Sequence, residues 1–143
     1  MIRIAAFFVL GVVSLHAQDR PKNIKILLLN GKNGKPMESE RLLIFLGNSP
    51  EEVRFHKGNA DLNTDGSGST QLLNEKAFSY LQVFVDFRTL CQDGPNNHAF
   101  SIDEVLRLGA QTPNNCSKVF HPNEPGTLIV YARQPTLRER MAW

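Results

Sequence analysis

Short apolar runs separated by turn residues make up most of the chain after residue 23. The first run covers residues 24–30 and is apolar without interruption from Ile26 to Leu29. A strand that is apolar on both faces is usually central in its sheet, or covered on its second face by another segment. We therefore expect a buried strand at residues 24–30.

The later runs predict further strands. In residues 78–88, Leu81, Val83, Val85 and Phe87 alternate with more polar positions, which is typical of a half-buried antiparallel strand. Phe84 falls on the more polar face, so it is either a contact for the insert at 91–116 or an exposed aromatic, and the pattern favours cover by the insert. The other predicted strands are residues 41–46, 53–55, 70–73 and 127–133, with 60–63 leading into a turn.

The turn at residues 62–68 is the centre of the predicted fold. Its sequence contains Thr64, Asp65, Gly66 and Gly68. An Asp side chain can bond its own backbone, and Gly adopts positive φ without steric cost. We interpret these four residues as a structural turn that joins two strands of a β-sandwich.

The same turn has a second interpretation as a weak calcium site. Asp61, Asn63 and Asp65 have the spacing of the first half of a calcium-binding loop, and hard cations prefer such oxygen ligands. The twelfth position of that loop should be Glu but is Leu72. The pattern favours a plain Asx-rich turn and leaves the calcium site as an alternative.

One short helix is predicted after Phe100. Ser101 and Glu104 fit a capping box, Phe100 can pack on Val105, and Gly109 ends the helix. A helix of two turns is not stable alone in water, so its apolar side chains must pack on the sandwich. These side chains are Val105, Leu106 and Leu108.

Cys91 and Cys116 are the two cysteines of the chain. In an oxidising compartment they are expected to form one disulfide, which closes an insert of residues 91–116. The alternative, a nucleophilic thiol, needs a basic activator that the sequence does not show. We expect the helix and its loop to form a clasp outside the sandwich.

The first residues predict export. Arg3 precedes an apolar run at residues 4–15, and the small residue Ala17 follows just after it, as in a secretory signal peptide. The run is shorter than the roughly 20 residues that span a bilayer, and no later segment approaches that length. We expect a signal peptide at 1–17, one domain at 18–134 and a tail at 135–143.

The tail could form a helical turn starting near Pro135. Leu137 and Met141 would then share one face beside Arg138 and Arg140. Packing on the core, disorder, and contact with a partner or an envelope surface all remain possible for this segment.

Charge and candidate chemistry exclude several classes of function. The chain has 16 Lys and Arg against 14 Asp and Glu, and its basic residues are scattered rather than clustered as in nucleic-acid sites. His56, His98 and His121 lack the spacing of metal ligands, and Ser67 lacks the setting of a nucleophile elbow. We expect no nucleic-acid partner, no cofactor, no strong metal site and no catalytic residue.

The turn motifs resemble those of carboxypeptidase regulatory-like domains. The similarity includes the turn from Gly31 to Pro36, the strand at 42–46, the turn at 64–68 and the strand at 78–87. It implies an all-β fold: an antiparallel, Ig-like or prealbumin-like (transthyretin-like) β-sandwich of about seven strands, with one short helix in the disulfide-closed insert. Turn motifs indicate fold more than function.

We therefore expect a secreted, periplasmic or extracellular, non-catalytic β-sandwich that binds an unidentified protein or glycan or has a structural role. The first alternative is a carbohydrate-recognition or calcium-dependent module that uses the turn near Asp65. The second is an unrecognised hydrolase.

Overall fold

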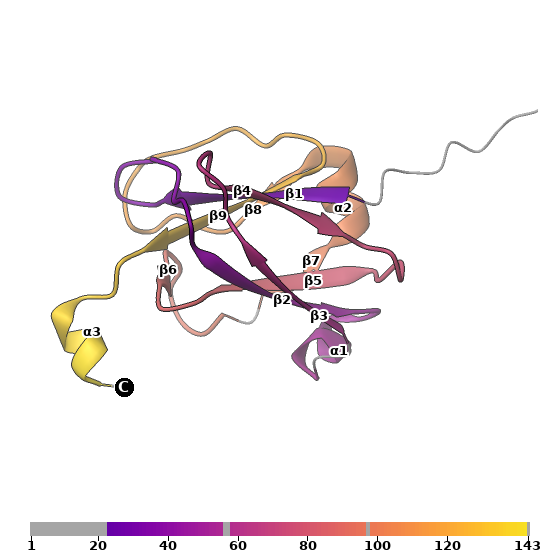
Figure 1. Ribbon diagram of the computed structural model, residues 1–143, viewed down its shortest axis with the longest axis horizontal. Helices are drawn as coiled ribbons and strands as arrows, with labels where there is room; N and C mark the ends of the chain where they lie inside the picture. Colours follow the sequence, from indigo (N-terminus) through magenta and orange to yellow (C-terminus); the bar gives the residue numbers. More distant parts are fainter. Residues whose placement is uncertain (1–22, 56–57, 97, 143) are drawn as a thin grey trace, which may run out of the picture.

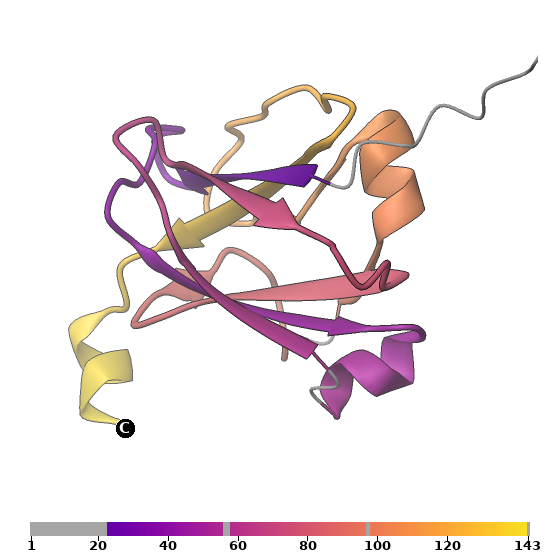
Figure 2. The same cartoon turned by 45° about the vertical axis from the view of Figure 1, so that its right-hand side comes forward.

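Two β-sheets pack face to face in the computed structural model, which describes residues 23–55, 58–96 and 98–142 (Figures 1 and 2). The strands are β1 (Asn23–Asn30), β2 (Arg41–Gly47), β3 (Gly58–Asn63), β4 (Ser69–Leu73), β5 (Tyr80–Val85), β6 (Thr89–Leu90), β7 (Phe100–Ser101), β8 (Ala110–Gln111) and β9 (Thr127–Arg133). The helices are α1 (Pro50–Arg54), α2 (Ile102–Leu108) and α3 (Leu137–Met141). The described part of the chain is thus an all-β sandwich with three short helices instead of the single helix expected.

The first sheet has the order β4-β1-β9-β6, with β8 also pairing with β9, and the second has the order β3-β2-β5-β7. Most neighbouring strands are antiparallel, as predicted. However, β9 is parallel to both β1 and β8, so the expectation of a wholly antiparallel sandwich is wrong. Parallel neighbours need a long crossover. Here the chain between β1 and β9 includes every strand of the second sheet and the whole insert.

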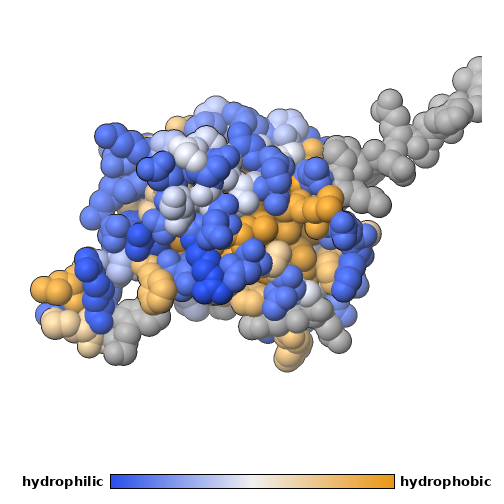
Figure 3. All heavy atoms as spheres, in the orientation of Figure 1, coloured by the Kyte–Doolittle hydropathy of each residue, from blue (hydrophilic) through white to orange (hydrophobic). Residues whose placement is uncertain are grey.

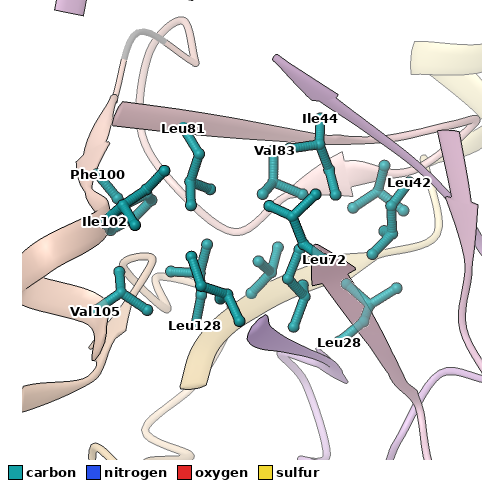
Figure 4. Close-up of a cluster of buried hydrophobic side chains, with 14 of the residues drawn as sticks. Leu28, Leu42, Ile44, Leu72, Leu81, Val83, Phe100, Ile102, Val105 and Leu128 are labelled. Carbon is teal, nitrogen blue, oxygen red and sulfur yellow. The ribbon is translucent and has the colours of Figure 1, made fainter. Parts of the chain in front are cut away.

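The main core lies between the two sheets, and Leu81, Val83 and Val85 of β5 point into it as their alternation predicted. Ile24, Ile26 and Leu28 of β1 are fully buried against side chains of the second sheet. Figure 4 shows side chains of β2 and β5 meeting those of β4 and β9 across this space. The buried set also includes Leu42, Ile44, Leu72, Leu81, Val83, Leu128 and Val130.

The outer face of the first sheet has a smaller core of its own. Leu27 and Leu29 of β1 pack there with Ile129, Tyr131 and Cys91. The segment after β8 covers them, because the backbone N–H of His121 donates to the Tyr131 hydroxyl at 3.0 Å. This cover explains why the β1 run is apolar on both faces.

The disulfide between Cys91 and Cys116 is present, but the insert is not simply an outer clasp. Ile102 and Val105 of α2 belong to the main core, so the helix closes one end of the space between the sheets (Figure 4). These two residues lie three apart and share one helix face. Leu108, which was expected to pack, points outward and is 51% exposed.

Residues 53–55 were predicted as a strand, and the structure shows helix α1 instead. The Ser49 side chain accepts a hydrogen bond from the backbone N–H of Glu52, and Pro50 opens the helix. Both features favour a helix start. Val53 is fully buried, which anchors this short helix on the sandwich.

The strand predicted through residue 88 ends at Val85. Residues 86 and 87 form a turn, and Phe87 is exposed instead of lying on the buried face. Phe84 packs edge-on against Phe45, with ring centroids 5.3 Å apart. On the same strand the insert reaches Gln82, whose side-chain amide donates to the carbonyl of Asn96.

The C-terminal helix α3 lies outside the two sheets at the end of β9 (Figure 2). Thr136 and Glu139 form a complete capping box, and no residue of the helix is buried. Glu139 also pairs with Arg133 of β9 at 2.7 Å. The tail therefore forms the helical turn that its sequence allowed as one of several alternatives, and no residue of α3 packs on the core.

Candidate functional site

The turn at residues 64–68 is tightly bonded to the sandwich. The buried Thr64 hydroxyl donates to the carbonyl of Met37 at 2.7 Å and accepts from the backbone N–H of Glu40 at 2.9 Å. A Cβ at residue 68 would lie 2.8 Å from the Leu28 carbonyl oxygen, and the φ of Gly68 is 73°, a conformation that favours glycine. At Gly66 the nearest atom would be 3.8 Å away, so that position does not require glycine.

Asp65 uses its carboxylate to close the turn. Its Oδ1 accepts hydrogen bonds from the Ser67 hydroxyl at 2.7 Å, the Ser67 N–H at 2.9 Å and the Ser69 N–H at 3.1 Å. These bonds, with the Ser67 hydroxyl contributing most, lower the pKa of Asp65. The geometry is that of an Asx-rich turn.

The other acidic member of the calcium alternative has a different partner. Asp61 accepts hydrogen bonds from the Arg41 guanidinium, with Nε 2.9 Å from Oδ1, and these bonds lower the pKa of Asp61. Arg41 also reaches Asp86 at 3.2 Å. Residues 23–55, 58–96 and 98–142 contain no group of three or more His, Cys, Asp or Glu placed to hold a metal. Nothing in this arrangement favours the calcium alternative over the turn.

Half of the predicted capping box is seen at the start of α2: the Ser101 side chain accepts from the Glu104 backbone, while no return bond from the Glu104 side chain is found among the described residues. The backbone N–H of Glu104 donates to the Ser101 hydroxyl at 3.4 Å, and Gly109 ends the helix with φ of 76°. A Cβ at residue 109 would lie 2.3 Å from the carbonyl oxygen of Glu124. Ser101 and Gly109 therefore define the two ends of α2.

The side of the sandwich opposite the insert exposes two edge strands, β3 and β4. β3 is the outer strand of the second sheet and β4 the outer strand of the first. At the other edges β6, β7 and β8, all within or next to the insert, extend the sheets. Among the described residues no further strand pairs with the outer edge of β3 or β4, so another chain could reach backbone groups on this side.

The register of β3 shows which of its backbone groups point outward. The Thr64 N–H donates to the Glu40 carbonyl at 2.9 Å, and residue 42 pairs with residue 62. In an antiparallel ladder bonded pairs alternate with unbonded ones. Residues 58, 60 and 62 therefore bond β2, and the N–H and C=O groups of Asn59, Asp61 and Asn63 point away from it.

A groove of about 300 Å³ runs beside this edge, and we call it the β3–β4 groove. Figure 3 shows apolar surface near the end of β4, between the two sheets. Leu73 is 53% exposed there. The apolar lining residues are Leu46, Ala60, Leu72, Leu73 and Phe78, and the polar ones include Asn59, Asn74, Glu75 and Lys76.

The loop that forms one wall of the groove is held in place by Asn74. Its side-chain oxygen accepts from the Phe78 N–H at 3.0 Å, and its side-chain nitrogen donates to the Phe78 carbonyl at 2.8 Å. The Phe78 ring lies against Gly58, where a Cβ would be 2.8 Å from the ring. The groove is therefore preformed in the free protein.

Sequence reasoning missed this groove. It treated residues 74–76 as a separator between strands and did not consider Gly58. The available signals were Asn74 four residues before Phe78 and the apolar Leu73 beside Leu72. Neither signal shows that the edge of β3 lies beside the end of β4.

The large exposed aromatic side chains of the described residues are spread over the molecule. Phe55 follows α1, Phe87 follows β5 and Phe120 lies in the segment that covers the first sheet. Sugar-binding sites commonly use neighbouring aromatic faces, and no two of these three lie on one element. The carbohydrate alternative gains no support from their positions.

Comparison with models of protein families, with curated proteins and with solved structures finds no match to this chain. The resemblance to carboxypeptidase regulatory-like domains therefore stays a prediction. Within the described residues, every helix is too short or too polar to cross a membrane. The predicted signal peptide at 1–17 lies outside the described residues.

Proposed function

We propose that this chain is an exported, non-catalytic binding module with a prealbumin-like sandwich, and that it takes an extended segment of another protein as an added strand on β3. The disulfide is compatible with a secreted or extracellular protein. The predicted signal peptide also supports export from the cytoplasm. Binding by strand addition uses main-chain hydrogen bonds for affinity and pockets for alternate side chains for specificity.

The observation that carries this proposal is the uncovered β3 edge with an apolar groove beside it. The outward N–H and C=O groups of Asn59, Asp61 and Asn63 are complementary to the backbone of an extended peptide. The groove beside them offers Leu73 and Phe78 to an apolar side chain of that peptide. β3 itself carries no Pro or Lys, two residues that commonly protect edge strands from pairing.

A peptide titration tests the proposal. The probe is a fluorescent peptide of alternating threonine and valine, and its control has proline at the centre. We expect saturable binding of the first peptide only. Asn59→Pro removes an outward N–H without breaking the bonds to β2, and we expect it to weaken binding by roughly tenfold, the loss of about one hydrogen bond.

Asn59→Ala is the matched control, because it keeps the N–H and should bind the peptide like the wild type. Circular dichroism of both variants checks that the sandwich is intact. Equal binding by Asn59→Pro and wild type would contradict the proposal. Sedimentation that shows a dimer lost in Asn59→Pro would assign the edge to a second copy of this chain and would also contradict it.

A further inference from the structure

A second exposed apolar surface surrounds the C-terminal helix. It consists of Phe87, Leu137, Met141, Arg138 and Arg140, and we call it the Phe87–α3 surface. Phe87 is 81% exposed, Leu137 69% and Met141 73%. Figure 3 shows apolar and strongly hydrophilic side chains next to one another at α3. It shares no residue with the β3–β4 groove.

Phe87 is turned outward by an unfavourable backbone conformation. Its φ is 53°, which is rare for a bulky side chain because Cβ approaches the following carbonyl oxygen. Alternation along β5 would place this ring on the buried face. Strained residues persist where the surrounding structure holds them, and they concentrate at functional surfaces.

The helix that carries the other two apolar side chains is fixed to the sandwich. Arg133 of β9 donates to both carboxylate oxygens of Glu139, at 2.8 and 2.7 Å. Leu137 and Met141 lie four residues apart, so they share one helix face. A hollow of about 410 Å³ is lined by Phe87 on one side and by Pro135 and Arg140 on the other. The turn after β5 and the start of the tail therefore line one hollow, and Leu137 and Met141 are exposed on the same short helix that carries Arg140.

The arginines on and around this surface differ in whether they form ion pairs with carboxylates. Arg88 pairs with Glu40 at 2.8 Å and Arg133 with Glu139 at 2.7 Å. Arg138 and Arg140 pair with no carboxylate among the described residues. Within the described part of the chain, the surface thus presents two cations without a carboxylate partner and three exposed apolar side chains.

We propose that the Phe87–α3 surface docks on the anionic headgroups of a lipid bilayer. Apolar side chains enter the boundary between headgroups and acyl chains, while neighbouring arginines bind lipid phosphates. Charge complementarity selects anionic over neutral lipid, and Arg suits phosphate because of its planar set of donors. The contact is peripheral and reversible, and it leaves the β3–β4 groove free.

Vesicle co-sedimentation tests this proposal with the whole mature chain. The vesicles contain phosphatidylcholine alone or phosphatidylcholine with phosphatidylglycerol, at low and at high salt. We expect binding to the mixed vesicles that falls at high salt. Replacing both cations, R138Q with R140Q, should weaken that binding by roughly twentyfold. Phe87→Ser should weaken it as well, through lost apolar contact.

The matched controls are R54Q with R107Q, which removes the same charge from α1 and α2, and Phe55→Ser, which removes another exposed ring. Both should bind the mixed vesicles nearly as the wild type does. Equal binding to neutral and anionic vesicles, or equal loss in the control variants, would overturn the proposal. Absence of binding at low salt would also overturn it and would leave an acidic protein as the occupant of this surface.

Discussion

Three residues other than glycine adopt positive φ in the described part of the chain, namely Ser39, Ala77 and Phe87. Ala77 precedes Phe78 in the wall of the β3–β4 groove, and Phe87 belongs to the surface beside α3. Such conformations cost free energy unless nearby structure compensates them. At the residue scale, strain therefore lies next to both surfaces for which we propose partners.

Phe87→Asn should stabilise the protein. Asn tolerates the left-handed conformation better than Phe does, and the exposed ring loses little contact in the free protein. We expect the free energy of unfolding to rise by about 1 kcal/mol. Urea denaturation measures it, and the same variant should bind anionic vesicles less well.

Phe55→Asn is the control for this prediction. Phe55 is also exposed, at 77%, but its φ is −89°, so no strain is relieved there. A gain in stability of similar size in both variants would show that removal of an exposed ring, and not relief of strain, is the cause.

At the scale of elements, the pattern of apolar residues located β1, β2, β4 and β9 within a residue or two. It also located α2, because its cap, stop and apolar spacing agree. It failed at α1, where a short run containing Val53 looked like a strand although Ser49 and Pro50 favour a helix start. A buried apolar residue indicates packing in either element, so the cap was the better guide.

Helix α3 should depend on pH through Glu139. The Arg133 guanidinium, with help from the Thr136 N–H, lowers the pKa of Glu139 from 4.5 to about 2. Because the folded value lies below the unfolded one, ionised Glu139 stabilises α3 above about pH 4.5. This stabilisation is lost as pH falls toward 2.

The Glu139 side-chain carbonyl signal, followed by NMR through an acid titration, measures this pKa. We expect a midpoint near 2 in the wild type. In Arg133→Gln the midpoint should rise toward the ordinary glutamate value, and α3 should fray at a higher pH. A wild-type midpoint that already lies at the ordinary value would show that the ion pair is not formed in solution.

At the scale of the whole molecule, the insert decides which side of the sandwich is open. It adds β7 to the second sheet and β8 to the first, and α2 closes the space between them. No comparable segment lies on β3 or β4 among the described residues. The molecule is therefore closed on one side and offers edge strands on the other.

The sequence was sufficient for the sandwich, the disulfide and the Asx-rich turn, because each depends on local spacing or on a unique pair of residues. It was insufficient for the groove, which depends on the register between β2 and β3. It also could not show that Arg41 binds Asp61, since these residues meet only across that ladder. Sites built from distant strands need the pairing of those strands to be known.

Hydrogen exchange of the β3 amides, measured by NMR with and without the threonine–valine peptide, tests strand addition most directly. In the free protein we expect fast exchange at Asn59, Asp61 and Asn63, and slow exchange at Ala60 and Leu62, which bond β2. Saturating peptide should slow the first three amides and leave the other two unchanged. If the peptide binds and these three amides still exchange fast, the β3 edge is not where the partner is held.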